Sequence, residues 1–162
     1  MTYNDALVKC ASLCAKTEYS KVELIGKMCR WGISRDMAKL ITDRLAEENY
    51  INEERFAQTF VYDKFNLNSW GRNKIRYYLK INGIGNELIK EAIGNINPQE
   101  YSDTLKRLLL SKLKTLTEKD PYKQKIALCR YAVSRGFETT IVTAAVNKMI
   151  AEGEEIEAPD EI

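Results

Sequence analysis

The sequence contains no histidine and no pair of cysteines spaced C-x-x-C. Protein zinc sites use Cys and His ligands above all, and histidine is the commonest general acid or base in enzymes. The sequence also shows no metal cluster and no nucleophile supported by a motif. We therefore predict a protein that is not an enzyme and has no catalytic residue, metal site or cofactor.

The sequence also lacks an apolar run approaching the roughly 18 residues of a membrane helix, and it shows no secretory signal at residues 1–5. Cys10 and Cys14 lie four residues apart on a predicted helix. They can be interpreted as a redox pair or as small core residues, and their neighbours Leu7 and Ala11 favour the core. Reduced thiols without an export signal predict a cytoplasmic protein that does not contact membranes.

Proline and glycine are scarce, with three and eight residues, and apolar residues recur at helical spacing with no alternating strand pattern. Ser20 and Glu23 form a predicted capping box, and Asn97-Pro98 and Asp120-Pro121 each place proline at the first position of a helix. The last predicted helix spans about residues 138–150. An all-α fold is predicted.

Three glycines, Gly32, Gly83 and Gly136, end predicted helices and lie 51 and 53 residues apart. Five positions around each glycine are apolar in all three copies, beginning with Leu24, Ile75 and Leu128 eight residues before it. The pattern predicts three tandem three-helix repeats, residues 1–50, 51–96 and 97–151, which stack into an elongated, curved array. Periodicity also assigns Tyr78 and Ile126 to the core faces of their helices.

Acidic residues are absent from Lys64 to Asn86, a stretch that contains five cations. Arg72, Arg76 and Lys80 are spaced i, i+4, i+8, which places them in one ridge beside the core face, and Tyr77 lies on the exposed arc. A solvated helix face is the simpler alternative. The uninterrupted positive charge favours contact with phosphate or an acidic protein surface.

Two further acid-free basic runs occur in the third repeat and include Lys123 and Arg130. Trp70, just before the basic helix, can serve as an anchor for a partner or as packing between helices. The candidate residues for binding a partner are Lys64, Trp70, Arg72, Lys74, Arg76, Tyr77, Lys80, Lys123 and Arg130.

The chain ends in an acidic segment, residues 152–162, with six acidic residues and no basic one. We interpret this segment as a disordered, solubilising tail. The alternative is a tail that competes with an anionic ligand for the basic face.

The most specific pattern is Asn52–Ala57, Asn-Glu-Glu-Arg-Phe-Ala, followed by Phe60-Val61, then Gly71 with Lys74-Ile75-Arg76, and Gly83-Ile84. In these residues the chain resembles the RecX family, the regulators of the bacterial RecA recombinase. Arg72 stands where that family often has proline. Arg55 lies inside the motif, and its acidic neighbours favour a structural ion pair over a ligand contact.

The resemblance implies three tandem three-helix repeats whose basic concave side fits the groove of a RecA filament or DNA. It further implies a monomer that binds the RecA filament and single- or double-stranded DNA, and that inhibits recombinase and ATPase activity in DNA repair and recombination without chemistry of its own. The alternative is a nucleic-acid-binding helical module that acts without RecA, with Tyr77 or Trp70 stacking on bases.

Overall fold

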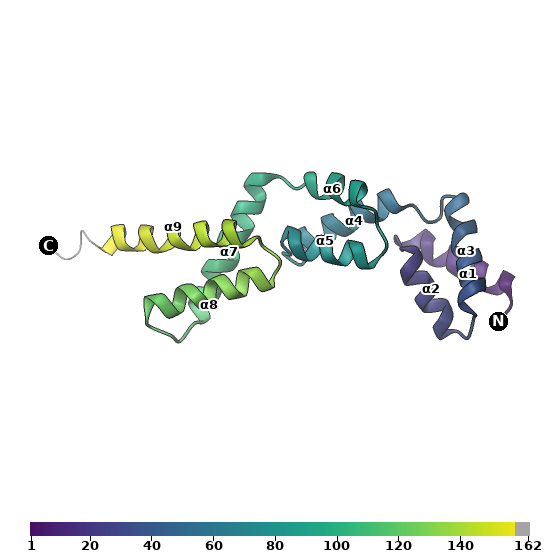
Figure 1. Ribbon diagram of the computed structural model, residues 1–162, viewed down its shortest axis with the longest axis horizontal. Coiled ribbons are helices and arrows are strands. Elements are labelled where there is room, and N and C mark those ends of the chain that lie inside the picture. The colour runs from purple at the N-terminus through teal and green to yellow at the C-terminus, as the bar shows by residue number, and fades with distance from the viewer. Residues whose placement is uncertain (158–162) are drawn as a thin grey trace. The chain divides into compact units, whose positions relative to one another are not determined.

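A computed structural model of the chain describes residues 1–157, with side chains through Gly153, and these residues form nine α-helices and no strand (Figure 1). The predicted all-α fold is therefore confirmed. The helices are α1 (Tyr3–Lys16), α2 (Lys21–Arg30), α3 (Arg35–Glu47), α4 (Glu53–Asn66), α5 (Arg72–Ile81), α6 (Asn86–Gly94), α7 (Pro98–Thr115), α8 (Pro121–Ser134) and α9 (Thr139–Glu157).

Helix starts follow the predicted capping residues. The Ser20 hydroxyl accepts a hydrogen bond from the Glu23 amide at 3.1 Å, and the Glu23 carboxylate accepts one from the Ser20 amide at 3.0 Å. Asn97 and Asp120 cap α7 and α8, each with proline in the first turn. These side chains satisfy amide groups that have no partner inside the helix.

The three predicted glycine stops share one backbone geometry. Gly32, Gly83 and Gly136 have φ angles of +87°, +77° and +99°, a region that favours glycine. In each turn, the amide after the glycine donates to a carbonyl five residues earlier, at 3.0, 3.1 and 3.2 Å. This is the Schellman ending of a helix. Its threefold recurrence confirms the tandem three-helix arrangement.

Three of the five aligned apolar positions are buried in all three repeats. Leu24, Ile75 and Leu128, eight residues before each glycine, are at most 2% exposed. The positions four residues before and one residue after each glycine are buried as well. The same positions therefore form the core of each three-helix set.

The chain divides into two compact units that do not coincide with the predicted repeat boundaries. Unit 1 contains residues 1–63 and 76–95, and unit 2 contains residues 64–75 and the chain from Ile96 onward. Residues 51–96 are thus divided, with the boundary inside α5. In unit 2, helices α7, α8 and α9 pack side by side (Figure 1).

The first turn of α5 belongs to unit 2 because its backbone is hydrogen-bonded to the α8–α9 turn. The Gly71 amide donates to the Arg135 carbonyl at 2.8 Å, and the Asn73 amide donates to the Gly136 carbonyl at 2.9 Å. A Cβ atom on Gly71 would lie only 2.3 Å from the Gly136 backbone. Such a close approach requires glycine at both positions.

Unit 1 contains a joint of the same kind. The Ser20 hydroxyl, at the start of α2, donates to the Asn82 side-chain oxygen at 2.7 Å, beside the α5–α6 turn. Val22 packs near Gly83 in that turn. In both units, the first turn of a repeat's middle helix packs on the glycine turn of the following repeat. This arrangement is typical of stacked helical repeats.

Three sequence predictions are wrong. Helix α9 continues to Glu157, so residues 152–157 are helical and not a disordered tail; no proline interrupts them, and Lys148 pairs with Glu152 at 4.0 Å. Residues 158–162 of the predicted tail lie outside the described residues. Tyr78 and Ile126 are 38% and 40% exposed, because the neighbouring helices cover a narrower arc than periodicity predicts.

Among the described helices, none has the length and apolar character required to span a membrane.

Candidate functional site

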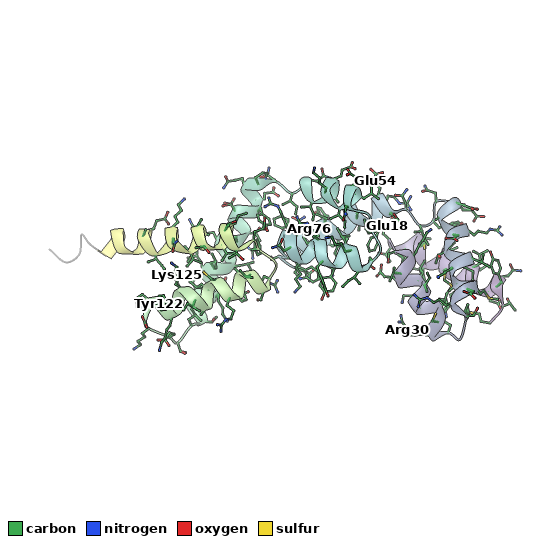
Figure 2. The ribbon with its side chains drawn as sticks, in the orientation of Figure 1. Glu18, Arg30, Glu54, Arg76, Tyr122 and Lys125 are labelled. Atoms are coloured by element: carbon green, nitrogen blue, oxygen red, sulfur yellow. The ribbon has the colours of Figure 1, made fainter. Side chains whose placement is uncertain are left out.

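The structure divides the nine predicted binding residues between the two units. Arg76, Tyr77 and Lys80 belong to unit 1, and the other six belong to unit 2. Tyr77 is 61% exposed and meets Tyr78 edge-on, with ring centroids 5.3 Å apart. Arg76, labelled in Figure 2, is partly buried on α5. Lys80 is exposed.

Arg72 is not the uncompensated cation that the sequence predicted. Its guanidinium lies 2.9 Å from a carboxylate oxygen of Glu138 and 3.9 Å from the ring centroid of Tyr101. Its backbone amide donates to the Tyr101 hydroxyl at 3.0 Å, and that hydroxyl donates in turn to Glu138. We call Arg72, Tyr101 and Glu138 the triad. Their contacts fix the start of α5 against α7 and against the start of α9. The predicted contact of Arg72 with a partner stays a prediction.

Burial and hydrogen bonding shift the pKa values of the triad. Burial, and then the hydrogen bond to Glu138, raise the pKa of the Tyr101 hydroxyl. Burial also acts to raise the pKa of Glu138, but hydrogen bonds from Tyr101 and Arg72 outweigh it and leave that pKa below its usual 4.5. The triad is therefore held with Tyr101 protonated and Glu138 ionised at neutral pH.

Replacing Glu138 by glutamine tests this triad. A lowered folded-state pKa stabilises the fold above the unfolded pKa near 4.5, and this contribution is lost as the pH falls below it. We expect the Glu138→Gln variant to lose about 1–3 kcal/mol of unfolding free energy at pH 7. The difference from wild type, measured by urea denaturation, should shrink below pH 4.5. Glu91→Gln, an exposed control without an ion pair among the described residues, should change stability little.

Trp70 lies between two predicted cations. The ammonium groups of Lys64 and Lys74 lie over its ring, 4.8 and 4.4 Å from the centroid. Because a cation over an indole face is attracted to it, Trp70 holds both ammonium groups in place. Trp70 is partly buried, which agrees with the packing interpretation, and its role as an anchor for a partner stays a prediction.

Two arginines that were not among the predicted binding residues reach the loop before α5. Arg107 donates to the Ser69 hydroxyl at 3.1 Å, and Arg135 donates to the Asn68 carbonyl. We call Lys64, Trp70, Lys74, Arg107 and Arg135 the loop cluster. The sequence placed both arginines in acid-free runs, but only the tertiary structure brings α7 and the α8–α9 turn to this loop.

Positive charge is concentrated in unit 2. Before the acidic segment of residues 152–162, unit 2 has 13 basic and 5 acidic residues, and that segment adds six acids; unit 1 has 12 of each. The predicted residues Lys123 and Arg130 are exposed on α8 and belong to this excess. Unit 2 is therefore suited to bind a polyanion.

Arg55 has the structural role that the sequence favoured. Its guanidinium lies 2.8 Å from Glu18 and donates to the Asn49 carbonyl at 3.0 Å. The partner is Glu18, before α2, and not an acid of its own motif (Figure 2 labels Glu18). Arg55 thus fixes the start of α4 within unit 1.

Cys10 and Cys14 behave as core residues. Cys10 is fully buried, and burial, followed by the neighbouring Cys10 and Glu18, raises the pKa of the Cys14 thiol to about 11. A thiol that resists ionisation is a poor nucleophile and metal ligand. Within the described part of the chain, no group of three or more His, Cys, Asp or Glu side chains could hold a metal ion.

Comparisons with known proteins agree with this architecture. Residues 52–93 match a family model described as RecX, second three-helix domain. The chain is 30% identical over 152 residues to the regulatory protein RecX of Clostridium botulinum (strain Eklund 17B / Type B), covering 90% of this chain and 71% of that protein. It is 29% identical over 151 residues to the RecX of Clostridium perfringens (strain 13 / Type A), covering 90% and 70%.

Two crystal structures have a similar fold. One, of a regulatory protein RecX, has a TM-score of 0.73 at 17% identity over 86% of this chain and 70% of that one. The other, of RecX from Lactobacillus salivarius, has a TM-score of 0.75 at 14% identity over 92% and 97%.

Proposed function

We propose that this chain, which belongs to the RecX family of regulatory proteins, regulates a RecA recombinase in the cytoplasm by binding its filament on DNA. The observation that carries this proposal is the excess of positive charge in unit 2 before its acidic segment, with 13 basic against 5 acidic residues in 64–75 and 96–151. A recombinase filament on DNA offers a protein surface together with the phosphates of the nucleic acid. It is therefore an extended anionic partner.

In this proposal, the loop cluster contacts phosphates directly. Lys64 and Lys74 supply ammonium groups that Trp70 holds in place, and Lys123 and Arg130 extend the positive surface along α8. Arg72 acts indirectly, because its ion pair with Glu138 positions the turn that carries Lys74. Bound in this way, the chain blocks filament growth or ATP turnover as a monomer and without chemistry of its own.

A recombinase assay tests the proposal. Adding the purified chain to RecA on single-stranded DNA is expected to lower both DNA-dependent ATP hydrolysis and strand exchange. The chain alone, without RecA, serves as the control for contaminating ATPase. Unchanged activity with the chain in stoichiometric excess would exclude this function.

The second candidate is nucleic-acid binding without a recombinase. It is favoured by the loop cluster, whose cations suit phosphates, and by the exposed Tyr77, which is available for stacking. Trp70 is less suited to stacking, since a base would have to displace an ammonium group from its ring. Binding of the chain to single-stranded DNA at low salt, weakening steeply as salt is added, would support this candidate.

A further inference from the structure

The outward face of α8 is apolar. Tyr122, Ile126 and Val133 are 70%, 40% and 41% exposed, and Cys129 lies partly buried among them. Their spacing of four, three and four residues places them in one row along the helix. We call these four residues the α8 stripe.

This stripe is separate from the face that packs in the core. Helix α8 packs against α7 and α9, and its core residues Leu128 and Ala132 are 2% and 0% exposed. At about 100° per residue, the α8 stripe lies roughly 110° around the helix from them. Helix α8 therefore carries more apolar side chains than its contacts within unit 2 cover.

Cations border the stripe on both sides. Lys123 and Arg130 are exposed along one edge, Lys125 lies along the other, and α8 contains no acidic residue. Figure 2 shows Tyr122 and Lys125 near the start of α8. An apolar row between two rows of positive charge is complementary to an amphipathic helix with an apolar face flanked by carboxylates.

We propose that the α8 stripe binds an acidic amphipathic helix of a protein partner, with the carboxylates of that helix paired to Lys123, Lys125 and Arg130. The inference rests on the proposed function and gives that regulator a protein-binding surface. Nucleic acid is a poorer occupant of the stripe itself, because only Tyr122 offers a ring for stacking, and Ile126 and Val133 offer neither a ring nor a donor to phosphate. A second copy of the stripe is also poorer, because a symmetric contact would bring like charges together.

A peptide-binding measurement tests the stripe. The probe is a fluorescein-labelled helical peptide of about 18 residues with leucines on one face and glutamates on both borders of that face. We expect the full chain to bind it with micromolar affinity in fluorescence anisotropy at near-physiological salt. Ile126→Asp with Val133→Asp should weaken binding at least about tenfold, because both leucine contacts are replaced by charge repulsion. Val8→Asp with Leu40→Asp, at two exposed positions of unit 1, should leave it unchanged.

Three outcomes would overturn the inference. The first is equal binding of a scrambled peptide with the same composition, which would indicate a contact by charge alone. The second is equal binding by the doubly substituted α8 variant with its circular dichroism unchanged. The third is self-association of the wild type in sedimentation velocity that the α8 variant abolishes, which would assign the stripe to a second copy.

The peptide assay contains no recombinase, so the two proposals fail separately. Peptide binding with no effect on RecA would refute the proposed function and leave the stripe as a site for another protein. Inhibition of RecA by a chain that does not bind the peptide would refute the stripe alone.

Discussion

Changing Lys64, Lys74 and Arg107 to glutamate is expected to weaken binding of the chain to a RecA–DNA filament at least about tenfold at physiological salt. These are three of the four cations of the loop cluster. Lys64 and Lys74 lie over the Trp70 ring, and Arg107 donates to Ser69. If each contacts a phosphate on single-stranded DNA, the salt dependence of binding, log K against log salt, should become shallower by about 2. Titration of filament binding at several salt concentrations measures both quantities.

The matched control changes Arg30, Arg35 and Lys39 of unit 1 to glutamate. These three residues are exposed, and the change in net charge is the same. Equal weakening by both variants would show that only total charge matters, and it would contradict a site in unit 2. Arg72 is left intact in both, because breaking its ion pair with Glu138 would confuse loss of binding with loss of folding.

Replacing Gly71 by alanine is expected to lower the unfolding free energy by about 2–4 kcal/mol. The added Cβ would lie 2.3 Å from the Gly136 backbone, so the start of α5 must move away from the α8–α9 turn. That movement breaks the hydrogen bond from the Gly71 amide to Arg135 and disturbs the Arg72–Glu138 pair beside it. Urea denaturation followed by Trp70 fluorescence, in a Trp31→Phe background, reports on unit 2.

Alanine substitutions at two other glycines distinguish the cost of steric crowding from the cost of backbone strain. Gly32→Ala meets open space but keeps a φ of +87°, so it should cost only about 1–2 kcal/mol. Gly26→Ala, inside α2 and with only an ordinary contact near its Cβ, should stabilise the protein by up to about 1 kcal/mol. A Gly71→Ala variant as stable as the wild type would show that the joint between α5 and the α8–α9 turn does not form.

Local signals in the sequence predicted the helices well because they act over a few residues. The capping residues Ser20, Asn97 and Asp120 start helices as predicted, and the three spaced glycines end them in one geometry. The predicted helix end near residue 150 was wrong, because the acidic composition of the segment says little about whether an uninterrupted helix stops there.

The candidate site was predicted in part. Lys64, Trp70 and Lys74 do lie together, since they belong to two helix ends joined by a short loop. The compensation of Arg72 by Glu138 could not be predicted, because the two residues are 66 positions apart and meet only through the α8–α9 turn. The exposure of Ile126 was missed for a similar reason: helical spacing marks an apolar residue but does not say whether a neighbouring helix covers it.

The order of short-range features along the chain was enough to establish nine helices in the described residues, three glycine turns and the excess of positive charge, because each depends on neighbours within a turn or on composition. Which cations are free for a partner, and which apolar face lacks a neighbour, was decided by packing. Those properties depend on contacts between segments that are distant in the sequence, such as Gly71 with Gly136 and Tyr101 with Arg72. The spacing of residues along the sequence does not reveal such contacts.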